Sequence, residues 1–156
     1  MATPGQDSHT PMLPRRAFLA ATLSAITVGA AGALAWIGGL GAPQTESYRF
    51  SRGTNLAEGE LARMRGHLAR AVQDTRFDVV IVGHTGDQGD GAANLALSTE
   101  RAEVAAAEAR QLGLEDSRLT IIGAGGGSPM ARGPDQSERA YQASLARVEI
   151  TLRPQR

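Results

Sequence analysis

Two stretches and one single residue are of types that bind ligands or catalyse reactions. The stretches are the Asp- and Gly-rich residues 86–91 and the glycine-rich run 123–128, and the single residue is Arg101. The glycine-rich run could cradle a phosphate, but such a turn opens directly into a helix, whereas Pro129 follows this one. Asp87 and Asp90 could ligate calcium, but neither spacing supplies the Glu that closes a calcium loop at its twelfth position. The spacings therefore argue against a phosphate loop and a calcium site.

Composition excludes several further classes of chemistry. The chain has 156 residues and no cysteine, which excludes a thiol nucleophile and Cys-ligated zinc. All 16 basic residues are arginine, so lysine-dependent phosphate loops, Schiff bases and Ser-Lys catalysis are excluded too. His84 has no neighbouring nucleophile or second His. Zero net charge argues against nucleic-acid binding. We expect a protein that is not an enzyme and uses no cofactor or metal.

The elements that would position these residues alternate between strands and helices. Apolar spacing predicts a helix from a cap at Thr54 or Asn55 to about Asp74, with Leu61, Met64 and Leu68 facing inward. Further helices are predicted at 93–112, ending at Gly113, and at 136–145. His67 is expected on a helix surface. Strands are predicted at 48–51, 78–83, 119–122 and 148–152. This order, β-α-β-α-β-α-β, indicates an α/β or α+β domain with helices packed on a sheet.

A segment without charge precedes this domain. Residues 1–14 have no apolar periodicity and are expected to be a disordered cytoplasmic leader. Residues 17–40 carry no charge after Arg15-Arg16 and would span about 36 Å as a helix, enough to cross a bilayer. Because the only nearby cations precede this segment, we expect a cytoplasmic N-terminus and an exported domain. The predicted division is 15–40 membrane segment, 41–47 linker and 48–153 domain.

Two interpretations of this segment remain open. Arg15-Arg16-Ala17-Phe18-Leu19 resembles a twin-arginine export signal, and Ala33-Leu34-Ala35 would suit cleavage by signal peptidase. Alternatively, the segment is retained as a single-pass inner-membrane anchor with the bilayer as its partner, which its apolar length favours. Cleavage near Ala35 would instead release a free periplasmic protein.

A set of short motifs resembles the signature of OmpA-like peptidoglycan-binding domains (the OmpA/MotB C-terminal type). Its members occur in the family's order across about residues 47–153: Gly83-His84-Thr85, Gly89, Asn94, Leu97-Ser98, Arg101-Ala102, Gly113, Arg118-Leu119, Gly123-x-Gly125, Pro129 and Arg147-Val148-Glu149-Ile150. The resemblance implies an α+β fold, with a mixed sheet and helices on one face.

The resemblance also implies a ligand and a site. In that family, an Asp after Gly-His-Thr and the Arg of the Leu-Ser-x-x-Arg-Ala run hold the ammonium and carboxylate at one end of diaminopimelate in the peptidoglycan peptide stem. Arg101 matches that Arg. The implied site comprises eight residues: Thr85, Gly86, Asp87, Asn94, Leu97, Ser98, Arg101 and Arg147. Without the resemblance, Arg101 would be interpreted as a solvated charge paired with Glu100, Glu103 or Glu108, and Asn94 and Ser98 as residues that cap or begin a helix.

The sequence departs from the family pattern at two places. Gly86 occupies the usual Asp position, and the aspartate follows one residue later at Asp87. Losing one side of a charge-assisted pair costs about 1.5–3 kcal/mol. Asp87 could restore the contact, with Asp90 as a less favoured substitute. Leu145-Ala146-Arg147 replaces the usual Asn-Arg-Arg. The resulting expectation is a membrane-anchored periplasmic domain that links the wall to the envelope, and the alternative is a protein-interaction module that has lost diaminopimelate binding.

Overall fold

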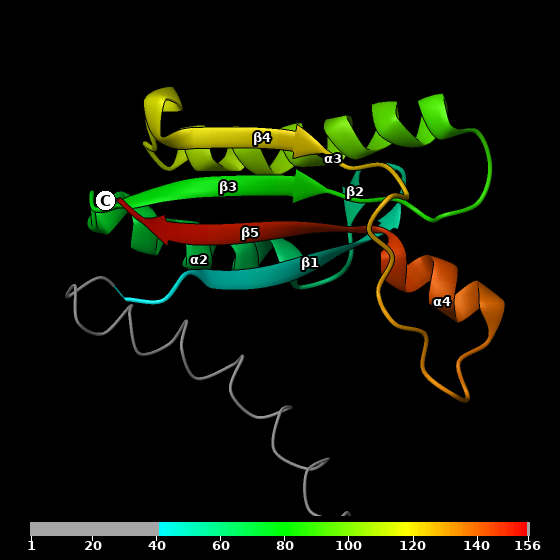
Figure 1. The fold of residues 1–156 in the computed structure, drawn as a ribbon. Coiled ribbons are helices and arrows are strands. Elements are labelled where there is room, and N and C mark those ends of the chain that lie inside the picture. The colour runs from blue at the N-terminus through cyan, green and yellow to red at the C-terminus, as the bar shows by residue number, and fades with distance from the viewer. Residues whose placement is uncertain (1–40, 156) are drawn as a thin grey trace, which may run out of the picture.

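A five-stranded mixed sheet forms the centre of the domain. The computed structural model describes residues 41–155, and within them the strand order is β2-β1-β5-β3-β4 (Figure 1). These strands are β1 (Gln44–Arg52), β2 (Asn55–Leu56), β3 (Phe77–Gly83), β4 (Leu119–Gly123) and β5 (Arg147–Pro154). Only β3 and β4 pair in parallel, and every other neighbouring pair is antiparallel. The predicted α+β class with a mixed sheet is confirmed.

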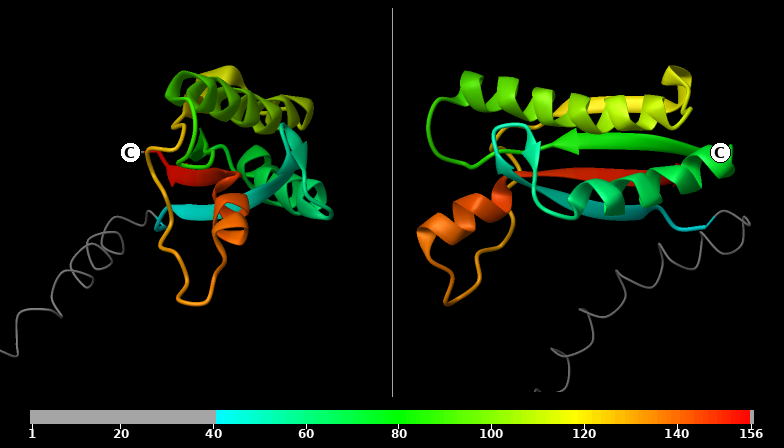
Figure 2. Two further views of the ribbon diagram at one scale, coloured as in Figure 1. Left: turned by 90° about the vertical axis from the view of Figure 1, so that its right-hand side faces the viewer. Right: turned by 180° about the vertical axis from the view of Figure 1, so that it is seen from behind.

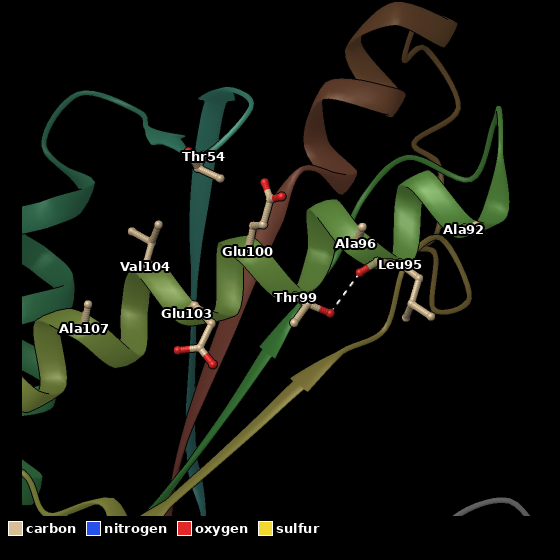
Figure 3. A pocket seen from close by; sticks show the side chains of 9 residues that line it. All are labelled: Thr54, Ala92, Leu95, Ala96, Thr99, Glu100, Glu103, Val104 and Ala107. Atoms are coloured by element: carbon tan, nitrogen blue, oxygen red, sulfur yellow. Dashed lines mark hydrogen bonds between the residues drawn. The ribbon is translucent and has the colours of Figure 1, made fainter.

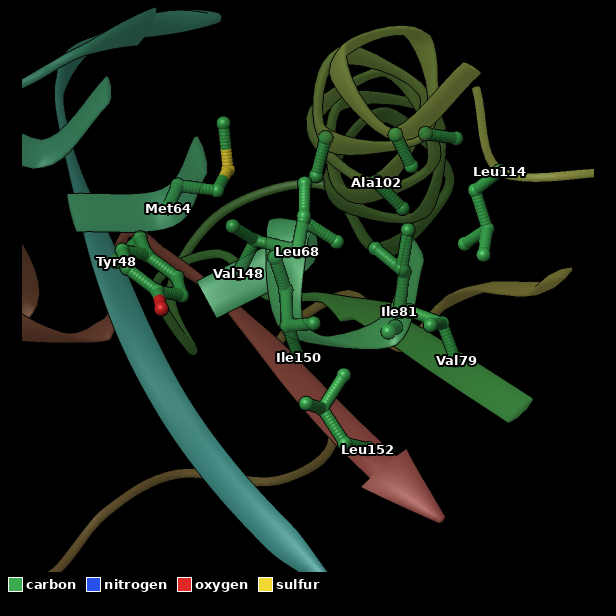
Figure 4. Close-up of a cluster of buried hydrophobic side chains, with 14 of the residues drawn as sticks. Tyr48, Met64, Leu68, Val79, Ile81, Ala102, Leu114, Val148, Ile150 and Leu152 are labelled. Carbon is green, nitrogen blue, oxygen red and sulfur yellow. The ribbon is translucent and has the colours of Figure 1, made fainter. Parts of the chain in front are cut away.

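Two helices, α2 (Glu60–Gln73) and α3 (Gly91–Gln111), cover one face of the sheet (Figure 2). The core lies between these layers, where alternate residues of β5 point inward and Val148, Ile150 and Leu152 are fully buried. Met64 and Leu68 of α2 pack into the same cluster (Figure 4). α3 contributes only alanines to the core cluster, so its backbone can approach the sheet closely. The short helix α4 (Glu138–Leu145) extends beyond the end of the sheet where β5 begins (Figure 1).

The first strand is longer than predicted and is followed by a second one. β1 begins at Gln44 because Gln44 pairs with Leu152 and Thr45 with Thr151, so residues 44–47 of the predicted linker belong to the sheet. Their polar, mostly exposed side chains give no alternating apolar pattern. The predicted cap of the next helix was wrong, since Asn55 lies in β2, which pairs back onto β1. α2 begins instead at Glu60, after Gly59 at φ 77°.

Two predictions of exposure on α2 were also wrong. His67 is buried rather than on the surface, because the hydroxyl of Tyr48 lies 2.9 Å from its Nδ1 and supplies a polar partner. Leu61, predicted to face inward, is 38% exposed in the first turn of α2, where Glu60 and Met64 are the buried residues instead. The inward positions of Met64 and Leu68 are confirmed.

The predicted leader and membrane segment, residues 1–40, lie outside the described residues. Within residues 41–155, no helix has the length and apolar character needed to cross a bilayer.

Candidate functional site

Arg101 lies on the buried side of α3, near the end of β3. Its guanidinium donates from Nε to the carbonyl of Gly53, in the turn after β1, at 2.8 Å. It donates from Nη1 to the carbonyl of His84, which follows β3, also at 2.8 Å. The ring of Phe50 lies beneath it, with the guanidinium carbon 5.1 Å from the ring centroid. Two segments far apart in the sequence, residues 50–53 and His84, therefore fix the orientation of one side chain.

This arginine is a buried cation with no anion beside it in the part of the chain that the structure describes. It is 5% exposed, and among residues 41–155 no carboxylate oxygen lies within 4.0 Å of its guanidinium nitrogens. The alternative interpretation, a pairing with Glu100, Glu103 or Glu108, does not hold among these residues, since Glu103 pairs with Arg110 and Glu108 with Arg65. Burial lowers the pKa of Arg101. Because only two of its five N–H groups have partners in the described residues, the guanidinium retains donors for an anion.

A close approach between α3 and β3 sets the position of this arginine. A methyl group added at Gly83 would lie 1.9 Å from the carbonyl oxygen of Ser98, so only glycine allows the helix to lie this near. The hydroxyl of Ser98 donates to the carbonyl of Leu95 and accepts from the backbone N–H of Gly125. Ser98 thus ties α3 to the loop after β4, one helical turn before Arg101.

The loop after β3 carries the next predicted residues. Thr85 is buried, and its backbone N–H donates to the carbonyl of Gly125. Asn94 closes the loop from α3 by donating to the carbonyl of Gln88 at 2.9 Å. Asp90 caps α3 by accepting from the backbone N–H of Ala93, so it is engaged as a helix cap. Leu97 is half-buried on α3.

Asp87 contacts α4. Its Oδ1 accepts a 2.6 Å hydrogen bond from Nε2 of Gln142, and its carboxylate does not lie within 4.0 Å of Arg101. Gly86 faces the same glutamine, because an added Cβ would lie 2.4 Å from Oε1 of Gln142. The space beside Gly86 is therefore occupied from α4.

Arg147 lies at the start of β5 and is buried. Its Nε donates to Glu149 at 2.7 Å, and Nη2 donates to the carbonyl of Ser128 in the loop after β4. His84 lies beside this pair, with Nε2 3.7 Å from a carboxylate oxygen of Glu149. Neither ring nitrogen of His84 has a hydrogen-bond partner in the described residues. Burial, together with the nearby cation of Arg147, lowers the pKa of His84, while Glu149 acts in the opposite direction.

The OmpA family model matches residues 49–143, more than half of the chain. The chain belongs to the OmpA family. No curated protein matches it.

Several solved structures share the OmpA-like fold. The peptidoglycan-associated lipoprotein from Burkholderia pseudomallei is 22% identical with a TM-score of 0.58, covering 69% of this chain and 89% of its own. The OmpA-like domain of FopA1 from Francisella tularensis is 18% identical with a TM-score of 0.59, covering 73% and 77%. The periplasmic domain of Helicobacter pylori MotB is 18% identical with a TM-score of 0.52, covering 68% and 70%. At these identities the likeness concerns the fold.

The OmpA-like fold brings some of the predicted residues together and separates others. Arg101 reaches the end of β3 by its bond to the carbonyl of His84, the residue before Thr85, whereas the carboxylate of Asp87 is bonded to Gln142 instead. Arg147 is linked to the same point by its backbone, since its carbonyl accepts from the N–H of His84. Sequence reasoning missed the two flanking contacts, Phe50 beneath Arg101 and Gln142 beside Gly86. Neither contact leaves a signal in the sequence, because both join segments far apart along the chain.

A separate apolar hollow runs along the outward side of α3 (Figure 3). It is lined mainly by Ala92, Leu95, Ala96, Val104 and Ala107, with Glu100 and Glu103 beside them. Leu95 is 52% exposed there. The hollow includes none of the eight predicted ligand residues, although Thr54 in its lining follows Gly53, whose carbonyl accepts from Arg101.

Proposed function

We propose that this domain binds the peptide stems of peptidoglycan without catalysing a reaction, and so links the cell wall to the envelope. Arg101 carries the proposal. A buried guanidinium without an anionic partner in the described residues is an unfavourable arrangement in an empty site and a favourable one when a carboxylate enters. The family membership of the chain supports the same ligand class.

In this proposal, the ligand is the diaminopimelate-containing stem, whose free end carries a carboxylate and an ammonium. Arg101 takes the carboxylate with its remaining N–H donors. The ammonium lies toward Thr85, Gly86 and Asp87, the segment that follows the His84 carbonyl held by Arg101. Ser98 already uses its hydroxyl as both donor and acceptor, so it positions the helix. The side-chain oxygen of Asn94 has no donor among residues 41–155 and would accept from the ligand.

We further propose that residues 17–40 hold the domain at the inner membrane, with the N-terminus cytoplasmic and the domain periplasmic. The absence of charge over these residues and the preceding Arg15-Arg16 support this placement. Because β1 begins at Gln44, few residues remain between the segment and the sheet. A carbonate wash of membranes tests retention: an anchored protein stays in the pellet, whereas a cleaved periplasmic form is released.

Retention on purified sacculi tests the wall-binding function. The full chain, solubilised in mild detergent, is incubated with sacculi and pelleted. Arg101→Ala is expected to lower the affinity about ten- to a hundredfold, because a charge-assisted contact is lost. Arg110→Ala is the matched control, since Arg110 lies on the same helix and is exposed. Equal retention of wild type and Arg101→Ala, with both folded by circular dichroism, would contradict the proposal.

A second candidate function is an interaction module for an envelope protein. The exposed Leu95 in the hollow along α3 favours it, because an apolar side chain in such a concave surface gains from being covered. Under this alternative, sacculus retention is absent or insensitive to Arg101→Ala. A Leu95→Glu variant, by contrast, would lose its native envelope complex on a sizing column.

A further inference from the structure

The oxygen of Gln142 occupies a particular place beside Gly86. Oε1 of Gln142 lies 2.4 Å from the position that a Cβ on Gly86 would take. Standard bond lengths place each carboxylate oxygen of an aspartate about 2.4 Å from its own Cβ. An oxygen from α4 therefore lies at the distance from residue 86 at which an aspartate there would hold its own oxygen.

The hydrogen bonds of Gln142 fix which end of its amide faces the site. Nε2 donates to Oδ1 of Asp87 at 2.6 Å and to Oε1 of Glu138 at 2.8 Å, which uses both N–H groups. A flipped amide would place its oxygen against two carboxylates, which is repulsive. Oε1 therefore faces Gly86, and no donor within residues 41–155 hydrogen-bonds to it.

The charges behind this amide make its oxygen attractive to a cation. Glu138 pairs with Arg132 at 2.7 Å, which balances one carboxylate. Asp87 has no cationic side chain within 4.0 Å among residues 41–155, so one negative charge remains beside the amide. Both carboxylates contact the N–H end and polarise the carbonyl toward Gly86.

We propose that Gln142 is the specificity-determining residue for the ammonium end of the ligand, and that its Oε1 accepts the ammonium hydrogen bond in place of the missing aspartate at position 86. The inference rests on the proposed function, since it assigns the second half of the same site. Asp87 does not contact the ammonium in this arrangement; it accepts from Nε2 of Gln142 and so holds and polarises the amide. The uncharged acceptor still selects a ligand with an amine beside its carboxylate, but less strongly than a directly contacting carboxylate would.

Two tripeptide ligands allow recognition of the amine to be measured separately from recognition of the carboxylate. One is N-acetylmuramyl-tripeptide ending in meso-diaminopimelate, and the other is the same molecule with the terminal amine replaced by hydrogen. Both retain the carboxylate that Arg101 would bind. Calorimetric titration of the full chain in detergent micelles gives the affinity ratio between them, and this ratio measures recognition of the amine alone.

The test variant is Gln142→Met, which keeps the side-chain length and helix propensity but has no oxygen acceptor. Gln88→Ala is the matched control, because Gln88 also donates to Oε1 of Glu138, at 2.9 Å, and its side chain does not contact Gly86. Wild type and Gln88→Ala are expected to prefer the amine-bearing tripeptide about tenfold. Gln142→Met is expected to bind both tripeptides equally.

The remaining outcomes separate this inference from the proposed function. Binding of both tripeptides by Gln142→Met with the wild-type preference retained overturns the role of Gln142 and leaves wall binding intact. Equal binding of the two tripeptides by wild type also overturns the role of Gln142 and leaves wall binding intact. Failure of wild type to bind either tripeptide overturns both the proposed function and the inference.

Discussion

Arg101 and Asp87 represent the two halves of the candidate site, and they are held in contrasting ways. Arg101 is buried and fixed by two main-chain carbonyls and an aromatic ring, all belonging to the sheet end. Asp87 is exposed and bonded to a side chain of α4, a helix that extends beyond the sheet. The cationic half is thus part of the fold, whereas the anionic half depends on the placement of one short helix. Substitutions can alter the second half without unfolding the first.

The largest effect is expected from a substitution that disturbs the rigid half. Gly83→Ala places a methyl group 1.9 Å from the Ser98 carbonyl and forces α3 away from the sheet. We expect a loss of about 3 kcal/mol in the free energy of unfolding, measured by urea denaturation. Gly91→Ala is the matched control, because nothing lies within 4 Å of an added Cβ there. Equal stability of the two variants would show that α3 adapts and that the cationic half is less rigid than its contacts indicate.

An intermediate effect is expected from replacing the Gln142 side chain beside Gly86 with an aspartate at position 86 itself. Gly86→Asp alone collides with the end of Gln142 and adds a charge near Asp87. Combining it with Gln142→Ala frees the space for the new carboxylate. We expect the double variant to bind the diaminopimelate tripeptide about tenfold more tightly than wild type, by calorimetry.

Gly91→Asp controls for the added charge in that comparison, because it carries the same carboxylate in open space. An unchanged affinity in the double variant would mean that residue 86 does not face the ligand ammonium, and that the contrast between the halves has no consequence for binding.

The smallest effect concerns pH and the buried histidines. Burial lowers the pKa of His67 and of His84, so the unfolded chain binds protons on these residues more readily than the folded chain. Folding stability from this source is complete above pH 6.5, the ordinary histidine value, and decreases as the pH falls below it. Melting temperatures at pH 7.5 and 5.5 measure the decrease, and His84→Asn should reduce it. A melting temperature that rises on acidification would contradict this assignment.

The order of elements was predictable because strand and helix patterns in the core are strongly periodic and glycines separate them. Val148, Ile150 and Leu152 alternate cleanly, and Gly113 at φ 95° follows α3 as expected. β2 was not predictable, since its two residues pair only because the chain turns back at Gly53. His67 was misplaced because a polar residue on a helix gives no sign of a distant Tyr48 hydroxyl.

The two halves of the site also differed in how far the sequence predicts them. The position of Arg101 follows from a local motif on a long helix, and its place at the end of β3 follows from the fold. The position of Gln142 depends on how residues 124–137 carry the chain from β4 to α4, and that path has no periodic pattern. Sequence reasoning could therefore identify the missing aspartate at Gly86 but not what occupies its space.

The antiparallel pairing of β1 with β5 also determines how the domain would carry mechanical load. The chain enters the sheet at Gln44, and Arg101 is bonded to Gly53, just past the other end of β1, about 30 Å away at roughly 3.3 Å per residue. A pull between a ligand at Arg101 and the chain before Gln44 would run along β1. Its hydrogen bonds to β5 lie across that direction. They would be sheared together rather than opened one at a time, which is the geometry that resists force best.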